Sequence, residues 1–473
     1  MSAQAGIGRR ALLRSGMLAS AGAAGGLWLT ACGPAAQQAA PQQGPAPTEL
    51  VLAPWGGWPA YGGPHWAEFV APAMDAFHQK NPGIKVTVVA PGGGGSFLPA
   101  ILAGTAPDVF QDWAIAQYRS GNLVVNLDRY IRQDNLDYGL WSPGQMNAMR
   151  DGEGTWFLPC YVHVDTMAVN LSILDALGLQ YPSPDWTHTE AAQLFRAAST
   201  TKGGKRQFGV SLKFQGNSMG DPNSTSSYVY HLFGGSMVDA TRTKAAVGDP
   251  KSYAGVQWLD QLYWDKVATS GSSDLGTVPF CEVGSNALVT YLKAWRDNFK
   301  WMFIPEPHFP AGQYSFEATD YYAINAQTKH PDESWILLRY LCAEPEWSRW
   351  CMKYLLRTPS IVSLWEEYVT TVEAVAPLVH NKGMEQFTAA ASKWGVANKI
   401  FKYGHVNAVN TLNTQLGKAF SQQASVPLAM TSAAGQIDAL EQAGAQEQTA
   451  TTAMAKAFPA ANGQQIAAVL PGL

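Results

Sequence analysis

The sequence predicts an α/β fold organised in two lobes. Short runs rich in β-branched residues alternate with stretches that place apolar residues at helical spacing, which is typical of layered α/β domains. About 425 residues follow an N-terminal segment of unusual composition, and that length exceeds the size at which one hydrophobic core stops growing. We therefore expect two lobes, each with its own strands and helices.

The first predicted unit is a strand at 49–53, a helix carrying Trp66, Phe69, Val70, Met74 and Phe77 at helical spacing, and a strand at 84–90. The motif Asn81-Pro82-Gly83 ends the helix, because proline and glycine break helical structure. Further along, the patterns predict a strand at 108–110, a helix at 187–201, a strand at 207–213 and a helix at 252–268. After about Pro359 the strand signals fade, which predicts a helical C-terminal section.

Residues 1–31 are predicted to be an export signal that is removed from the mature protein. Three arginines (Arg9, Arg10 and Arg14) and no acid precede an uncharged Ala/Gly/Leu stretch at 15–29. This stretch is about 15 residues long, whereas a membrane span needs about 20. The segment GRRALLR resembles the twin-arginine export pattern, and LTAC at 29–32 resembles a lipobox. Cys32 is therefore the expected lipidated residue.

Residues 32–48 are predicted to be a lipidated cysteine followed by an extended linker. Gly33 to Thr48 contains four Pro, four Gln and five Ala and no charge, a composition that buries nothing. As a coil, this linker would reach roughly 20 to 24 Å. The rest of the chain has no second long apolar run, so we expect the lipid alone to hold the protein at the outer face of the cytoplasmic membrane.

The charge and cysteine content exclude several classes of partner. Without residues 1–31 the formal net charge moves from −4 to −7, which argues against nucleic acid. Cys160, Cys281, Cys342 and Cys351 show no CxxC spacing, so we expect no metal and no redox pair. Cys342 and Cys351 are close enough in sequence to form a disulfide, and buried thiols are the alternative.

Six motifs follow one another along the chain after the predicted signal and linker. They are AFHQKNPGIKV at 76–86, AGTAPDVF at 103–110, GNLVVNLDRYI at 121–131, GTWFLPCYVHVDTMAVN at 154–170, DALGLQYPSPDWTHTEAAQL at 175–194 and YYAINAQTKHPDESWILLRYL at 321–341. Together they resemble the family 1 extracellular solute-binding proteins of ABC importers, a group that includes sugar-binding proteins. One departure is Asp320, which stands near the point where the family usually has a glycine, shortly before the returning strand.

The resemblance implies a periplasmic-binding-protein-like (type II) fold, with two α/β lobes around a ligand cleft and hinge strands between them. The N-terminal lobe would comprise 49–160 plus 306–360, and the C-terminal lobe 161–305 plus 361–473. It also implies a protein that binds a solute without converting it, needs no cofactor, and delivers the solute to the transmembrane subunits of an ABC permease. We expect a monomer.

The chemistry of the cleft is predicted to suit a carbohydrate. A sugar ring stacks its C–H face on an aromatic side chain, while its hydroxyls pair with carboxylates, amides and histidine. Aromatic residues expected in loops at strand ends are Trp55, Trp58, Trp113, Tyr161, Trp295 and Tyr321, and polar residues beside them are Asp112, His163 and Asp165. On a strand, Tyr161, His163 and Asp165 would share one face. Arg357 is either a ligand contact or part of a salt bridge that closes the lobes.

The sequence also allows other interpretations of these residues and of the solute. His163 could be a hydrogen-bonded structural histidine, Asp108 is better explained as structural, and Trp66, Trp258 and Trp347 fall in amphipathic helices and are expected in the core. The solute could instead be a polyamine, glycerol phosphate or iron, the last because Tyr321 and Tyr322 form a tyrosine pair. The GxSxG match at 216–220 would make Ser218 the nucleophile of an exported hydrolase, although the loop-like residues after it do not suit a nucleophile elbow.

Overall fold

The computed structural model describes residues 46–54, 66–89, 97–112, 118, 122–150, 154–212, 227–270, 275–396, 401–403 and 405–457. Contacts divide the chain into Met1–Ala46 and Pro47–Leu473, and the fold below is that of the second unit. The predicted signal, Cys32, Trp55, Trp58, Trp113 and Ser218 lie outside the described residues. Within the described part, no helix is both long and apolar enough to cross a membrane.

The first lobe, as we use the term, comprises the elements packed around the hydrophobic cluster that includes Leu50, Phe110 and Trp347. Its parallel strands are β1 (Thr48–Ala53), β2 (Ile84–Val88) and β3 (Val109–Asp112). Its helices are α1 (Trp66–Lys80), α2 (Leu98–Leu102), α4 (Asp128–Gln133), η2 (Tyr138–Leu140), α5 (Pro143–Met149), α10 (Pro331–Cys342) and α11 (Pro345–Leu355).

Asp108 fixes the entry to β3 as a structural residue, as expected. Its carboxylate accepts a hydrogen bond from the backbone N–H of Val51 at 2.8 Å and another from the hydroxyl of Thr328 at 2.5 Å. These bonds join β1, β3 and the segment after the returning strand. The carboxylate is therefore occupied by the fold.

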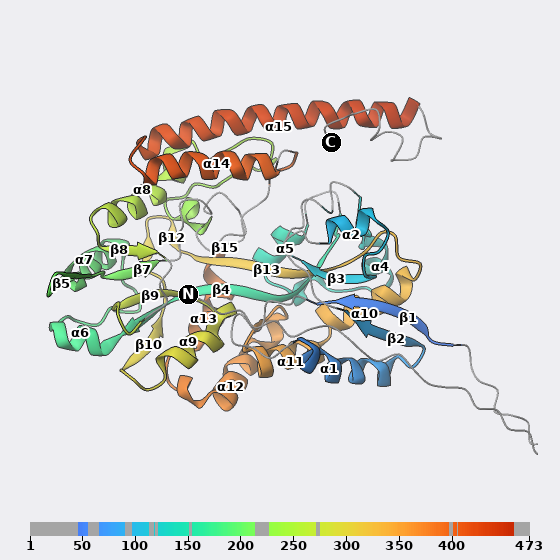
Figure 1. Cartoon of the computed structure of the whole chain (residues 1–473), viewed down its shortest axis with the longest axis horizontal. Coiled ribbons are helices and arrows are strands. Elements are labelled where there is room, and N and C mark those ends of the chain that lie inside the picture. Colours follow the sequence, from blue (N-terminus) through green and yellow to red (C-terminus); the bar gives the residue numbers. More distant parts are fainter. Residues whose placement is uncertain are drawn as a thin grey trace, which may run out of the picture. The chain divides into compact units, whose positions relative to one another are not determined.

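Two long strands connect the first lobe with the second. β4 (Leu158–Asn170) and β13 (Ser315–Ile324) run antiparallel and side by side (Figure 1). β13 also pairs with β3, while β4 pairs with β9 (Phe280–Gly284), β10 (Trp301–Ile304) and β14 (Thr358–Pro359). One sheet therefore continues through both lobes, in the order β2-β1-β3-β13-β4-β9-β7-β8.

The second lobe comprises the elements packed around two further hydrophobic clusters, one containing Phe195 and Phe280 and the other containing Val164 and Phe387. Besides β9 and β10 it has α6 (Leu171–Leu177), α7 (His188–Ala198), β5 (Thr200–Lys202), β6 (Lys205–Gln207), β7 (Val210–Leu212), η3 (Ser227–His231), α8 (Pro250–Trp264), β8 (Ala268–Ser270), η4 (Ser285–Ala287), α9 (Leu288–Trp295), β11 (His308–Phe309) and β12 (Gly312–Gln313). β7 runs parallel to both β8 and β9.

The C-terminal section is helical, as the sequence predicts. It contains η5 (Val362–Leu364), α12 (Trp365–Val375), η6 (Pro377–Val379), α13 (Glu385–Ala389), the π-helical turn η7 (Ala390–Trp394), α14 (His405–Phe420) and α15 (Val426–Ala457). α15 lies along α14 (Figure 1), and its buried Glu441 accepts hydrogen bonds from the backbone N–H groups of Lys402 and Tyr403. The exception to the prediction is β15 (Gly395–Val396), a two-residue strand that pairs with β13.

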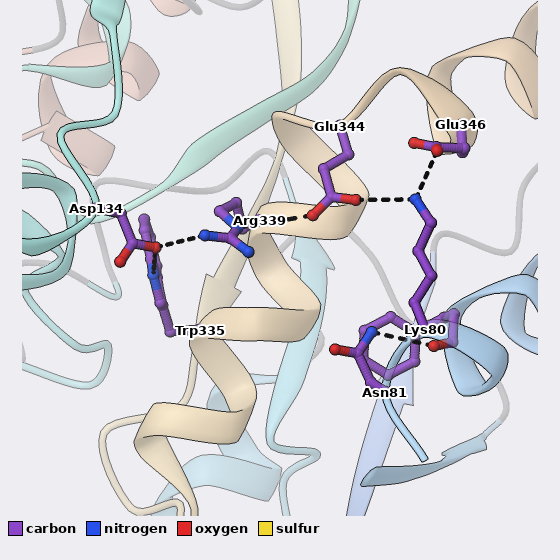
Figure 2. A network of polar contacts seen from close by, with 8 residues as sticks. Lys80, Asn81, Asp134, Trp335, Arg339, Glu344 and Glu346 are labelled. Atoms are coloured by element: carbon purple, nitrogen blue, oxygen red, sulfur yellow. Dashed lines mark hydrogen bonds and ion pairs between the residues drawn. The ribbon is translucent and has the colours of Figure 1, made fainter. Parts of the chain in front are cut away.

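A network of charged side chains ties the helices of the first lobe together on its surface (Figure 2). Lys80 at the end of α1 contacts Glu346 at 2.5 Å and Glu344 at 3.4 Å. Arg339 on α10 contacts Asp134 at 2.7 Å and reaches Glu344 at 3.6 Å. Because these groups are solvent-exposed, each pair contributes less than about 1 kcal/mol to stability.

Most predicted elements are confirmed within two or three residues, and one is wrong in an informative way. The single strand expected at 207–213 is two short strands, β6 and β7, that belong to different sheets. Gly209 lies at the break, where a Cβ atom would come within 1.8 Å of the backbone oxygen of Phe195 on α7. Its N–H bonds instead to Val267 at 2.9 Å. Close packing against a helix therefore interrupts the strand.

The four cysteines among the described residues are buried free thiols, so Cys342 and Cys351 do not form the disulfide that the sequence left open. Burial raises the pKa of Cys160, Cys342 and Cys351. These thiols are therefore protonated at neutral pH and behave as small apolar side chains.

Candidate ligand-binding site

A band of polar side chains occupies the middle of the crossing strands. We call it the polar belt, and it consists of Gln111, Tyr161, His163, Asp165, Asp320 and Arg357. On the same face of β4, Met167 and Val169 belong to the second-lobe core, while Tyr161 borders the first-lobe core. The polar belt therefore separates two hydrophobic cores, and it lies where the lobes meet.

Strand periodicity and register create this belt. Side chains at 161, 163 and 165 point to one face of β4, as predicted, and the rings of Tyr161 and His163 are in edge contact at 5.3 Å. Asp320 on β13 pairs with Tyr161, and a register shift follows directly between Asp320 and Tyr321. Such an irregularity re-aims side chains.

His163 and Asp320 form the centre of the belt. Nε2 of His163 lies 3.0 Å from a carboxylate oxygen of Asp320, and the two side chains are only 13% and 11% exposed. Burial alone would raise the pKa of Asp320, but the charge and hydrogen bond of His163, with the charge of Arg357, lower it below its ordinary value. Asp320 is therefore ionised, and it orients the imidazole.

Tyr161 links the centre of the belt to the first lobe. Its hydroxyl accepts a hydrogen bond from Nε2 of Gln111 on β3 and also bonds Asp320. The guanidinium of Arg357 stands 5.5 Å from the centre of the Tyr161 ring. Arg357 thus belongs to the belt itself, next to both an aromatic ring and an ionised carboxylate.

Asp112 and Tyr321 occupy the first-lobe side of the site. Asp112 is the last residue of β3, and its carboxylate accepts a hydrogen bond of 2.6 Å from the hydroxyl of Tyr118. Tyr321 pairs with Asp112 but is 2% exposed within β13, and its ring contacts Phe157 in the first-lobe core. The expectation that Tyr321 stands in a loop is wrong, and so is the same expectation for Tyr161, which lies inside β4 and is fully buried.

Trp295 is a second correction. It is the last residue of α9, not a loop residue, and it is 1% exposed in the second-lobe core. Its ring stacks on Tyr291 at 5.3 Å and contacts the edge of Trp301 at 5.1 Å. We therefore leave Trp295 out of the proposed contact set. Trp347 is a core residue, as expected, and Trp258 is half-buried against the second-lobe core.

Sequence reasoning missed the acidic second-lobe side of the belt. Glu282 on β9 and Glu306 are 3% and 4% exposed, and their charges, with that of Asp165, act on the buried Tyr228 of η3. Burial is the main cause that raises the pKa of Tyr228, and these carboxylates add to it. The sequence signal for this side of the belt was the glutamate inside the apolar run FCEVG. A charged residue in a buried strand is rare and usually has a specific partner or function.

This arrangement suits the recognition of a polyhydroxylated ligand. Carboxylates accept hydrogen bonds, and Arg357 and His163 can donate them. Tyr161 and Arg357 are buried in this structure, where the Tyr161 ring faces His163 and Arg357, so a ligand would reach them only after the lobes separate. Trp55, Trp58 and Trp113 follow β1 and β3 in the sequence but lie outside the described residues. In open parallel sheets, ligands bind beyond the carboxyl ends of the strands. Among the described side chains, no group of three or more His, Cys, Asp or Glu could hold a metal ion.

The continuous sheet, the two cores and the polar belt between them define a two-lobed α/β binding protein of the periplasmic type II class. The comparison with family models then gives the family. The chain belongs to the bacterial extracellular solute-binding proteins, whose model matches residues 63–345. This is a family of binding proteins rather than enzymes, in agreement with the expectation from the sequence. A comparison with curated protein sequences finds no match.

Solved structures of similar fold support the same class. An ABC substrate-binding protein from Listeria monocytogenes in complex with cycloalternan is 16% identical, with a TM-score of 0.66 over 83% of this chain and 98% of that chain. A cyclic α-maltosyl-1,6-maltose binding protein from Arthrobacter globiformis is 16% identical, with a TM-score of 0.66 over 84% and 100%. The sugar-binding protein MalE from Xanthomonas citri is 17% identical, with a TM-score of 0.66 over 84% and 98%.

Proposed function

We propose that this protein captures a carbohydrate between its two lobes and delivers it to the transmembrane subunits of an ABC permease. The polar belt is the observation that carries the proposal, because it combines an aromatic ring with charged hydrogen-bonding groups at the junction of the lobes. Solved structures of the same fold include complexes with cycloalternan and mannobiose. A ligand that touches both lobes only when they are closed would shift the population toward the closed form.

The proposed contact set consists of Asp112, Tyr161, His163, Asp165 and Arg357, with Trp55, Trp58 and Trp113 from the loops after β1 and β3. We keep the predicted lobe boundaries, 49–160 plus 306–360 and 161–305 plus 361–473, as part of the proposal. The lobes would act as one monomeric receptor.

A screen of neutral mono- and oligosaccharides by thermal shift tests the proposal. A ligand present at a hundredfold excess over its Kd stabilises the folded form by about 2.7 kcal/mol, which a melting curve detects. The set should include cycloalternan, maltose and mannobiose, with putrescine and glycerol 3-phosphate for the non-sugar alternatives. A response to putrescine that disappears at high salt, with none to any sugar, would contradict the proposal.

A substitution at the belt then ties binding to the site. Replacing His163 with Ala removes one hydrogen-bonding group and leaves buried Asp320 without its partner, so we expect the Kd of the identified sugar to rise about 10- to 100-fold. The matched control is His380→Ala, because the His380 side chain is 65% exposed and distant in sequence from the belt. Equal affinities for the two variants would place the ligand elsewhere.

The tyrosine pair Tyr321 and Tyr322 does not favour the alternative that the solute is iron. Tyr321 contacts Phe157 and Tyr322 contacts Trp347, so the two rings pack into different surroundings. Burial raises the pKa of both phenols, and this opposes the phenolate form that would bind ferric iron.

We also propose that the mature chain starts at a lipidated Cys32 after twin-arginine export, and that this lipid is its sole link to the membrane. The proposal is supported by the sequence GRRALLR, the tetrad LTAC at 29–32 and the uncharged linker that follows. Such an anchor would keep a receptor near its permease at the outer face of the cytoplasmic membrane. Cell fractionation of Cys32→Ser should move the protein from the membrane to the soluble fraction. A variant that stays with the membrane would contradict the anchor.

A further inference from the structure

Glu317 is a buried acid on the face of the crossing strands opposite to the polar belt. It is 2% exposed, and it pairs with Val164, whose side chain lies in the second-lobe core. The belt residues of β4 are Tyr161, His163 and Asp165, which alternate with Val162 and Val164 and so point the other way. Glu317 therefore has no place in the proposed ligand contacts.

The carboxylate of Glu317 holds the start of α5. The hydroxyl of Ser142 donates a hydrogen bond of 2.6 Å to Oε1, and the backbone N–H of Gln145 donates another. Ser142 and Gln145 also form the capping box of α5 with each other. Trp141 and Met149, at either end of α5, lie in the first-lobe core. The acid on a crossing strand is thus bonded to a helix of the first lobe.

A residue of the second lobe lies on the other side of the same carboxylate. A Cβ atom at Gly395 of β15 would lie 2.2 Å from Oε2, and one at Gly144 of α5 would lie 2.3 Å from the same oxygen. A Cβ atom at either position would therefore displace the carboxylate from where it stands. Gly395 follows the π-helical turn η7, whose Ala390 and Ala391 belong to the second-lobe core. The carboxylate is therefore enclosed between α5 of the first lobe and β15 of the second.

Few other charges face this position. α5 and β15 contain no titratable residue, η7 contributes only the exposed Lys393, and β4 presents valines. On β13 itself, Tyr321 is the titratable neighbour that senses the charge of Glu317. Burial raises the pKa of Glu317 to about 7, although the hydrogen bonds from Ser142 and Gln145 act to lower it. The charge of Glu317 therefore changes in the neutral range.

We propose that Glu317 is a positioning residue for lobe movement, which keeps α5 and β15 together when protonated and favours their separation when ionised. An ionised carboxylate gains hydration when α5 and β15 part, whereas a neutral one has little to gain. The inference rests on the proposed function in one respect, namely that the lobes move about the crossing strands. It adds a dependence of that movement on pH.

Spin labels at the residue that follows α5 and on η7 test the inference without any ligand. The labels go on Arg150→Cys and Ser392→Cys, both exposed, in a full chain that also carries Cys32→Ser; the four native thiols are buried and stay unlabelled. If separation returns the pKa of Glu317 to its ordinary value, the ratio of separated to packed molecules should rise about tenfold between pH 6 and pH 8. With Glu317→Gln the ratio should change less than twofold.

Two further variants sharpen the result. Glu385→Gln removes an exposed acid from α13 and should leave the pH response intact. Gly395→Ala should displace the carboxylate from its position, so that the separated form persists at every pH. A pH response that survives in Glu317→Gln, or a wild-type distance that does not change from pH 6 to pH 8, would overturn the inference. A failed sugar screen would instead contradict the proposed function and leave the label distances unaffected.

Discussion

Replacing Glu317 with Gln should change how the stability of the folded protein depends on pH. The ordinary pKa of a glutamate is 4.5, and burial raises that of Glu317 to about 7 in the folded state. Below pH 4.5 the carboxyl is protonated in both the folded and the unfolded chain, so it carries no penalty. Between the two values the unfolded chain ionises first, and the folded state loses stability as pH rises. Above pH 7 the loss is complete.

The size of the effect follows from the two pKa values. Each pH unit between them corresponds to about 1.4 kcal/mol, so the ionised carboxyl costs the folded state about 3 kcal/mol at pH 8 relative to pH 4.5. Glutamine keeps the shape and cannot ionise. The variant should therefore approach wild type at pH 4.5 and exceed it at pH 8. The gain should be at most about 3 kcal/mol, because the variant also loses hydrogen bonds that the ionised carboxylate accepts more strongly.

Urea unfolding followed by tryptophan fluorescence at half-unit steps from pH 4.5 to pH 8.5 measures this difference directly. The control Glu385→Gln should follow the wild-type curve, because its acid is exposed. A difference between wild type and Glu317→Gln that stays constant across the whole pH range would refute the reasoning. It would mean that the carboxyl has the same pKa in the folded and unfolded chains.

Three other substitutions have defined outcomes. Trp295→Ala should lower the free energy of unfolding by about 3 to 5 kcal/mol in urea titrations, because the ring lies in the core. The Kd of the identified sugar should not change. A large loss of affinity without a loss of stability would show that Trp295 contacts the ligand. Gly209→Ala should destabilise by at least about 3 kcal/mol, since the backbone oxygen of Phe195 cannot give way as a side chain could, and a change below 1 kcal/mol would disprove that close approach. Lys80→Ala should cost less than about 1 kcal/mol and lose even that in high salt, because Lys80 is exposed and its partners Glu344 and Glu346 are half-exposed. A cost that does not depend on salt would contradict this.

Sequence patterns predicted the elements whose signals are local. β1 and β2 come from short β-branched runs, and α7 begins at a capping box in which Thr187 and Glu190 bond each other's backbone. The break at Gly209 was out of reach, because it depends on how closely α7 passes the strand. That distance is a property of tertiary packing.

In the site, too, local features could be predicted from the sequence and tertiary contacts could not. The shared face of Tyr161, His163 and Asp165 followed from the period of a strand, but the partner of His163 did not, because Asp320 reaches it through the register of β4 with β13 and the shift beside it. Trp295 was misplaced although its signal was present. Leu288, Tyr291, Leu292 and Trp295 recur at helical spacing and are all buried on α9.

The acids of the crossing region were overlooked for a different reason. Glu282 interrupts the apolar strand FCEVG, and Glu317 lies buried in the strand SFEATDYYAI. A charge at a buried position requires a partner or a function. Which of these it has depends on neighbours that come from distant segments. Ser142, for example, is 175 residues from Glu317 in the chain.

The strand order has a consequence for synthesis. β13 lies between β3 and β4 in the sheet, yet about 145 residues separate the end of β4 from the start of β13. The edges of β3 and β4 that pair with β13 therefore stay unpaired until β13 has been synthesised. Until residue 324 has emerged, the nascent chain carries two unpaired apolar edges, which other chains can pair with. We expect chains that end between residues 170 and 315 to aggregate rather than to yield a free first lobe.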